Sequence, residues 1–156
     1  MRTLIVFLLS YASVFGADGD MRIFTTAQTN AQTGSIITQD FFTRDGQTNL
    51  ERRTYAQAGV VQKRIHLFRH AGSVLAEHFA TPDSSSYFVT EAGTPYSVIL
   101  ESDATRNPRS VVIRTGVVSI ISDIFLCTNG LFSPVESSVL TKANAIGSPL
   151  GEGRMK

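Results

Sequence analysis

Short runs of alternating hydrophobic and polar residues fill most of the chain, and residue–glycine pairs separate them. The runs are rich in Val, Ile, Thr, Phe and Tyr, which favour β-strands. Glycine suits the tight turns of β-hairpins because these turns need a positive φ. The pattern therefore predicts antiparallel strands joined by hairpins. The pairs are Asp45-Gly46, Ala58-Gly59, Ala71-Gly72, Ala92-Gly93, Thr115-Gly116 and Asn129-Gly130.

The first three of these glycines are evenly spaced. Gly46, Gly59 and Gly72 lie 13 residues apart, which leaves room for a strand of about 11 residues and a two-residue turn. This spacing predicts a β-meander, later interrupted by polar stretches at 81–86 and 103–110. The expected strands cover residues 22–28, 35–43, 48–57, 60–70, 73–81, 87–91, 95–102, 110–114 and 117–128.

The last part of the chain changes its hydrophobic period. Residues 117–128 are the most continuously apolar run, so we expect them at the centre of a sheet. A helix should follow, with Ser133 as its cap, Pro134 in its first position and Glu136 as the capping-box acid. We therefore expect a mainly β fold, an antiparallel β-meander (curved sheet or barrel-like) with one C-terminal α-helix packed on it. The helical positions are Val135, Val139, Leu140, Ala143 and Ile146, before Gly147 and Pro149.

The first residues have the three-part pattern of a cleaved signal peptide. Arg2 precedes an uncharged, largely apolar run at residues 3–16, and small and acidic residues follow. Cleavage after Gly16 fits better than cleavage after Ala17, which would put the bulky Phe15 at the −3 position. The alternative is an N-terminal strand of the domain. We expect a secreted or periplasmic protein with a signal peptide at 1–17, one β-rich domain at 21–147 and a loose tail at 148–156.

Composition narrows the possible partners. Removing Arg2 takes the Lys and Arg count from 14 to 13, against 13 Asp and Glu. A neutral domain without a basic block gives no electrostatic case for binding nucleic acid. We expect no stable membrane anchor after cleavage, because no later apolar run approaches membrane-spanning length without a charge. An unidentified protein or small ligand remains as the partner, and the oligomeric state is open.

Cys127 is the single cysteine, so it has no internal disulfide partner. It follows an apolar run, which favours a small buried side chain over an intermolecular bridge or a reactive thiol. Nucleotide-binding loops, metal-ligand spacings and a nucleophile elbow are missing from the sequence. We therefore expect no cofactor and no metal.

The predicted hairpins place possible functional residues on one sheet face. Two-residue turns at Ala58-Gly59 and Ala71-Gly72 would align Glu51, His66 and Glu77 in a row across three strands. An imidazole between two carboxylates could act as an acid–base group. The neighbouring candidates for ligand binding are Arg53, Arg64 and Tyr55. A β-bulge would shift this register and dissolve the row.

The charged row has a simpler interpretation, a solvated sheet face whose opposite charges pair across strands. We prefer this interpretation, and with it a non-catalytic binding or structural role for an exported domain. The alternative is a small hydrolase-type enzyme that uses Glu51, His66 and Glu77. A meander with a helix against it could offer a partner a groove or a free edge strand.

Overall fold

The computed structural model describes residues 5–10, 21–89, 96–116 and 120–147, which form eleven strands and one helix. Their bounds are β1 (Ile5–Ser10), β2 (Arg22–Asn30), β3 (Ser35–Arg44), β4 (Gln47–Gln57), β5 (Val60–His70), β6 (Ser73–Ala80), β7 (Ser85–Val89), β8 (Tyr96–Ser102), β9 (Pro108–Thr115), β10 (Ile120–Thr128), β11 (Leu131–Pro134) and α1 (Ser137–Gly147).

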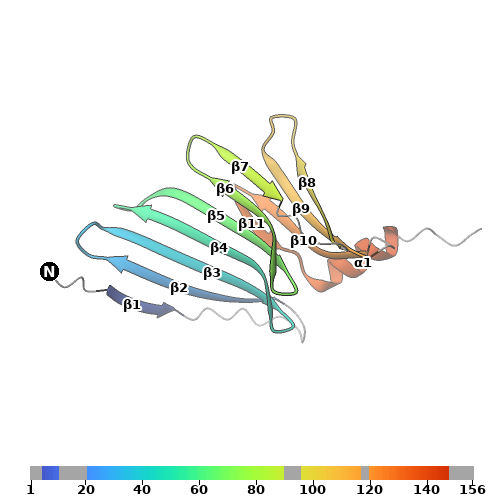
Figure 1. The fold of residues 1–156 in the computed structure, drawn as a ribbon, viewed down its shortest axis with the longest axis horizontal. Helices are drawn as coiled ribbons and strands as arrows, with labels where there is room; N and C mark the ends of the chain where they lie inside the picture. Colours follow the sequence, from blue (N-terminus) through green and yellow to red (C-terminus); the bar gives the residue numbers. More distant parts are fainter. Residues whose placement is uncertain (1–4, 11–20, 90–95, 117–119, 148–156) are drawn as a thin grey trace, which may run out of the picture.

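The strands form two antiparallel sheets in which chain neighbours are also sheet neighbours (Figure 1). Strands β1 to β7 make the long sheet, and β8 to β11 make the short sheet. The predicted meander with a C-terminal helix is confirmed. Among the described strands, the first and last strands of each sheet do not pair with each other. The two sheets are therefore open and do not close into a barrel.

The hairpin turns have the predicted left-handed backbone. Ala71 and Gly72 have φ values of 47° and 81°, and Ala58 and Gly59 have 49° and 78°. The pairs at Asp45 and Asn129 behave in the same way, and Gly116 also has a positive φ. Two consecutive positive φ angles are the mark of a type I′ hairpin turn. The pair Ala92-Gly93 lies outside the described residues.

A β-bulge near the turns at Asp45-Gly46, Ala58-Gly59 and Ala71-Gly72 shifts the strand register by one residue. His70 pairs with Ser73, as the two-residue turn requires, but Phe68 pairs with Ala76. Leu75 is therefore the extra residue, and both Leu75 and Ala76 are fully buried. Similar shifts occur between β3 and β4 and between β4 and β5. A bulge lets two consecutive side chains enter the core, which strict alternation forbids.

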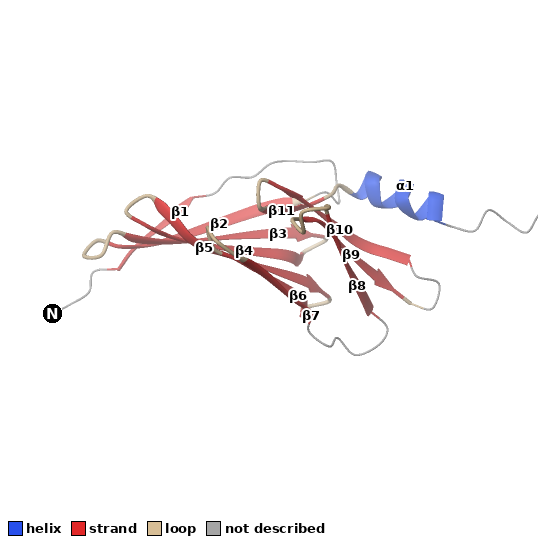
Figure 2. Ribbon diagram, turned by 90° about the horizontal axis from the view of Figure 1, so that it is seen from above, coloured by secondary structure: helices blue, strands red, loops and turns tan. Residues whose placement is uncertain are grey.

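The hydrophobic core lies between the two sheets, on what we call the inner face of the long sheet (Figure 2). Phe68 is fully buried there, and its ring centroid lies 5.0 Å from those of both Phe125 and Phe132. Edge-to-face aromatic packing of this kind stabilises beyond area burial alone. The core cluster comprises Phe42, Leu50, Phe68, Leu75, Ala76, Val111, Ile113, Phe125 and Phe132.

The prediction that 117–128 forms a central strand is confirmed for the described part, because β10 lies between β9 and β11. The predicted helix start is wrong. Ser133 and Pro134 belong to β11, which pairs with Leu126 and Phe125 of β10. Pro134 fits this position because β11 is an edge strand, where a missing N–H costs no ladder bond. The first helical bonds are accepted by the Glu136 carbonyl.

Helix α1 packs against β10 and completes its hydrogen bonding. The Asn144 side chain accepts a bond from Ile121 N–H at 2.8 Å and donates one to the Ile121 carbonyl at 2.9 Å. Leu140 is buried, whereas Ile146 is 85% exposed, so only part of the predicted apolar stripe faces the sheet. Among the described helices none is long and apolar enough to cross a membrane.

Strand β1 falls inside the residues predicted to form a signal peptide. It lies at the edge of the long sheet, where Ile5 to Ser10 pair with Asn30 to Thr25 of β2. The residues around the expected cleavage site and the expected tail at 148–156 lie outside the described residues. Export of the chain stays a prediction.

Candidate functional site

The predicted row of Glu51, His66 and Glu77 does not form. His66 pairs with Arg52 on one side and His78 on the other, whereas Glu51 and Glu77 both pair with Leu67. The two bulges shift β4 and β6 by one residue relative to β5, and a shift of one residue moves a side chain to the opposite face. His66 therefore lies on the inner face, and the two carboxylates lie on the outer face.

Glu51 is an ion-pair centre on the outer face rather than a partner of His66. Arg53 Nε lies 2.6 Å from Glu51 Oε1, and Arg69 Nη2 lies 3.0 Å from Glu51 Oε2. The Glu51 side chain is buried, and its carboxylate raises the pKa of Arg53 through their hydrogen bond. Glu77, in contrast, is exposed. The charge of Glu51 is paired, as the simpler interpretation expects, but its side chain is buried rather than solvated, and Arg53 lies on the same strand.

The three predicted binding residues do not share one face. Arg53 and Tyr55 lie on the outer face, where Lys63 Nζ stands 4.4 Å from the centre of the Tyr55 ring. Arg64 lies on the inner face and pairs with Ala80 of β6. The structure therefore separates Arg64 from the other two candidates.

On the inner face His66 meets a second histidine, His78. The two Nδ1 atoms lie 3.3 Å apart, and His66 Nε2 accepts a hydrogen bond from the Phe132 N–H at 3.3 Å. The Phe132 ring stands edge-on to both imidazoles, with centroid distances of 5.2 Å and 5.1 Å. His66 is 0% exposed and His78 is 3% exposed, so both rings are part of the core.

Burial keeps both imidazoles neutral. Desolvation, together with the smaller effects of His78, Arg52 and Arg64, lowers the pKa of His66 to about 3. Desolvation also lowers the pKa of His78. A buried imidazole without a carboxylate partner loses its proton because the charged form is poorly solvated. Neither histidine is charged near pH 7.

His78 also lines a cleft of about 750 Å³ at the end of the space between the sheets. The cleft is bounded by the turn after β6, the loop between β8 and β9, and the turn after β10. Its floor includes Ala80 and Cys127 as well as His78. The cleft is large enough for a small molecule. Its other lining residues are Thr81, Pro82, Asp83, Ser84, Ser85, Asp103, Thr105, Arg106, Asn107, Pro108, Arg109, Asn129 and Gly130.

His78, one of the residues that line this cleft, has a buried polar atom without a protein partner. His78 Nε2 is buried and makes no hydrogen bond. An unsatisfied buried polar group costs about 1–3 kcal/mol, so its presence needs a reason. A ligand in the cleft could supply the missing bond.

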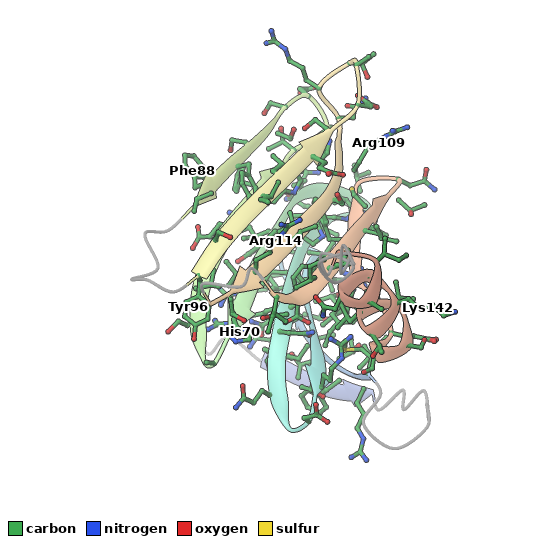
Figure 3. The ribbon with its side chains drawn as sticks, turned by 90° about the vertical axis from the view of Figure 1, so that its right-hand side faces the viewer. His70, Phe88, Tyr96, Arg109, Arg114 and Lys142 are labelled. Atoms are coloured by element: carbon green, nitrogen blue, oxygen red, sulfur yellow. The ribbon has the colours of Figure 1, made fainter. Side chains whose placement is uncertain are left out.

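The loop between β8 and β9 is ordered by its own hydrogen bonds. Asp103 Oδ1 accepts bonds from the Thr105 N–H, the Thr105 hydroxyl and the Asn107 N–H at 2.8–2.9 Å. These bonds lower the pKa of Asp103. The loop is thus a prebuilt wall of the cleft, and Figure 3 shows Arg109 beside it, well above His70 and Tyr96.

Cys127 is half-buried on the floor of the cleft, and burial raises the pKa of its thiol. The predicted position of Cys127 inside a strand is confirmed, since it pairs with Phe132 of β11. A raised pKa disfavours the reactive thiolate. Across the described part of the chain no group of three His, Cys, Asp or Glu side chains could hold a metal ion.

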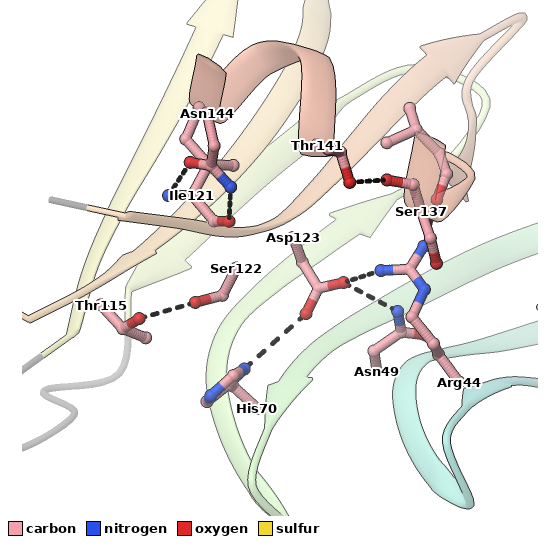
Figure 4. Close-up of polar contacts among 11 residues, drawn as sticks. Arg44, Asn49, His70, Thr115, Ile121, Ser122, Asp123, Ser137, Thr141 and Asn144 are labelled. Carbon is pink, nitrogen blue, oxygen red and sulfur yellow. Dashed lines mark hydrogen bonds and ion pairs between the residues drawn. The ribbon is translucent and has the colours of Figure 1, made fainter. Parts of the chain in front are cut away.

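A second polar cluster joins the two sheets at the other end of the core (Figure 4). Asp123 of β10 accepts bonds from Arg44 Nη1 at 2.8 Å and Asn49 Nδ2 at 3.0 Å, and His70 Nδ1 lies 3.7 Å away. Arg44 also donates to the Val135 carbonyl. We call these residues the Asp123 clasp. The Asp123 carboxylate is paired with side chains of the long sheet, which favours a structural role, although Arg44 Nε and Asn49 Oδ1 make no hydrogen bond.

The sequence singled out His66 but missed His78 and the whole cleft. A register without bulges would place His78 on the opposite face from His66, and no signal in the sequence indicates a bulge. The cleft is built by three turns that are distant in the sequence, and only the packing of the two sheets brings them together.

A scan against protein-family models and searches of curated proteins and solved structures find no match to this chain.

Proposed function

We propose that the chain is a non-catalytic binding domain of an exported protein, and that its ligand occupies the cleft between the two sheets. The observation that carries the proposal is the unpaired His78 Nε2, a buried polar atom beside a cleft of about 750 Å³. A ligand that satisfies this atom would offset the cost of burying it. The N-terminal pattern of charge, apolar run and small residues supports export.

The arrangement of the site favours binding over catalysis. The acid–base pair that the enzyme alternative requires would join His66 to Glu51 or Glu77, and both carboxylates lie on the other face of the sheet. His66 and His78 are neutral members of the core without a carboxylate partner, and of the two only His78 lines the cleft. The cleft instead combines an ordered loop wall with a lining that is mostly polar, which suits a polar ligand held by hydrogen bonds.

The test is native mass spectrometry of the protein recovered from its own host. We expect a chain that starts after Gly16 or Ala17 and carries the extra mass of a bound molecule. The spectrum therefore reports processing and ligand retention together, and the two halves of the proposal can fail separately.

A pair of variants ties the extra mass to the cleft. Ala80→Trp should fill the cleft and remove the extra mass, because Ala80 is a floor residue. The matched control is Ala27→Trp, a change of the same size on the same face of β2, four strands away. Retention of the extra mass by Ala80→Trp, or its loss from both variants, would count against the cleft as the binding site.

A further inference from the structure

The hydrogen bonds of the histidine pair determine where its protons lie. Because Phe132 N–H donates to His66 Nε2, that nitrogen carries no proton. A neutral imidazole has one ring proton, so in His66 it lies on Nδ1. This proton points along the 3.3 Å contact to His78 Nδ1, which must accept it. The single proton of neutral His78 therefore lies on Nε2.

His78 consequently offers a hydrogen-bond donor that no protein group accepts. Two further buried donors on the inner face are also unsatisfied, Tyr87 Oη and Arg64 Nε. Tyr87 pairs directly with His78 across β6 and β7, and Arg64 pairs with the floor residue Ala80. Burial raises the pKa of Tyr87 to about 12, so its hydroxyl keeps its proton. Three neighbouring donors thus lack an acceptor oxygen.

Positively charged side chains also line the cleft. Arg106 and Arg109 both line it, and within the described residues neither has an ion-pair partner. Two acidic residues, Asp83 and Asp103, also line the cleft. The Asp103 carboxylate already accepts hydrogen bonds from its own loop. Arginine is the side chain best suited to carboxylate and phosphate groups, because its planar fork donates two bonds at once.

We propose that the cleft selects a ligand with an oxyanion, a carboxylate or a phosphate, whose oxygen accepts the hydrogen bond of His78 Nε2–H while Arg106 and Arg109 balance its charge. The proposal rests on the cleft being the binding site, as argued above, and adds the chemical class of the ligand.

The first part of the test reads the proton positions in the ¹⁵N-labelled full chain at pH 7.5. Long-range ¹H–¹⁵N correlation spectra distinguish the two neutral tautomers of each imidazole. We expect His66 with its proton on Nδ1 and His78 with its proton on Nε2. A proton on Nδ1 of His78 would overturn the inference, since the cleft would then present an acceptor.

The second part titrates the same sample with inorganic phosphate and with acetate, using sodium chloride at matched ionic strength as the control. We expect a saturable shift of the His78 Nε2 signal with at least one of the two anions, and none with chloride. Comparing phosphate with acetate identifies the preferred oxyanion. Equal shifts with chloride, or no saturable shift with either anion, would overturn the inference.

Two arginine variants test whether the anion binds in the cleft. Arg109 is exposed, so Arg109→Gln should fold normally and weaken anion binding by about tenfold. The matched control is Arg22→Gln, an exposed arginine on β2, which should leave the affinity unchanged. Equal affinities of the two variants would contradict the proposed site.

The two proposals fail differently. If the protein retains an uncharged molecule that Ala80→Trp displaces, and neither anion binds, the cleft is a binding site but the oxyanion inference is wrong. If no molecule is retained and both titrations stay flat, both proposals are wrong.

Discussion

At the scale of single residues, burial decides the protonation of the histidine pair. His66 has a folded pKa of about 3, against 6.5 when exposed, and the pKa of His78 is lowered in the same direction. Between these two pH values His66 is protonated in the unfolded chain but stays neutral in the folded chain. Stability therefore rises with pH in this window and is lost as the pH falls below 6.5.

We predict that the free energy of unfolding decreases as the pH falls from 7 towards 4. His66 alone should remove about 3 kcal/mol by pH 4, at about 1.4 kcal/mol for each pH unit below its unfolded pKa. Urea unfolding measured at several pH values checks this. His66→Gln cannot titrate but keeps an acceptor for the Phe132 N–H, so its stability should depend less on pH.

Asp123 acts in the opposite direction. Desolvation raises its pKa, so in the pH range between its unfolded and folded pKa values the folded chain holds a proton that the unfolded chain has already released. The comparison of the native chain with His66→Gln leaves Asp123 unchanged in both proteins. If both proteins show the same pH slope, the histidine is not responsible for the acid sensitivity.

At the scale of elements, the hairpins that turn at Asp45-Gly46, Ala58-Gly59 and Ala71-Gly72 each combine a left-handed turn with a nearby bulge. The turn determines which residues begin the ladder, and the bulge determines which side chains face the core farther along. Two of the turns contain alanine in the left-handed region, Ala58 at φ 49° and Ala71 at φ 47°. The left-handed conformation is sterically unfavourable for alanine by about 1–2 kcal/mol, and much less so for asparagine.

We predict that Ala58→Asn and Ala71→Asn each raise the free energy of unfolding by about 1 kcal/mol. Both alanines are exposed, so the larger side chain meets no neighbour. Chemical denaturation measures the change. Ala27→Asn within β2 is the control and should be destabilising, since asparagine is unfavourable in strands. A loss of stability in both turn variants would contradict the assignment of these turns.

At the scale of the whole molecule, the core and the Asp123 clasp hold the two sheets together. The core supplies nondirectional apolar contact, whereas the clasp connects β10 to β3 and β4 through charged hydrogen bonds. Asp123 and Arg44 have side chains that are only 8% and 11% exposed. Removing one partner of such a pair leaves the other charge buried and unpaired.

We predict that Asp123→Asn lowers the free energy of unfolding by about 3 kcal/mol. It should also reduce the hydrogen-exchange protection of β9 and β10 more than that of β3 to β5. The matched control is Asp40→Asn, which breaks the half-buried pair with Arg52 within the long sheet, where Arg52 Nη2 lies 2.8 Å away. If Asp40→Asn loosens the short sheet equally, the clasp does not join the sheets.

The comparison of sequence with structure separates local from distant effects. The hairpin turns were predictable because a residue–glycine pair between strand-forming runs leaves the backbone few alternatives. The register beyond Phe68 was not predictable. Leu75 and Ala76 are both buried because the short sheet covers them. Their burial stabilises a bulge that local sequence propensity does not indicate. The same bulge brings His78 to the face of His66, which a register without bulges would not do.

The start of the helix shows the same limit. Ser133, Pro134 and Glu136 satisfy the local pattern of a helix cap, but Ser133 and Pro134 also suit the end of an edge strand. The pairing of β11 with β10 decided between the two, because it gains ladder bonds and buries Phe132 against Phe68. Local preferences of this size are routinely overridden by tertiary contacts.

The sequence alone thus determined the antiparallel meander, the positions of its turns and the presence of one C-terminal helix, because each follows from contacts between residues close in the chain. Only the tertiary structure decided which face each side chain takes, which histidines meet and where the cleft lies. These features depend on one-residue bulges and on the packing of two sheets, and both are selected by the burial of residues far apart in the sequence.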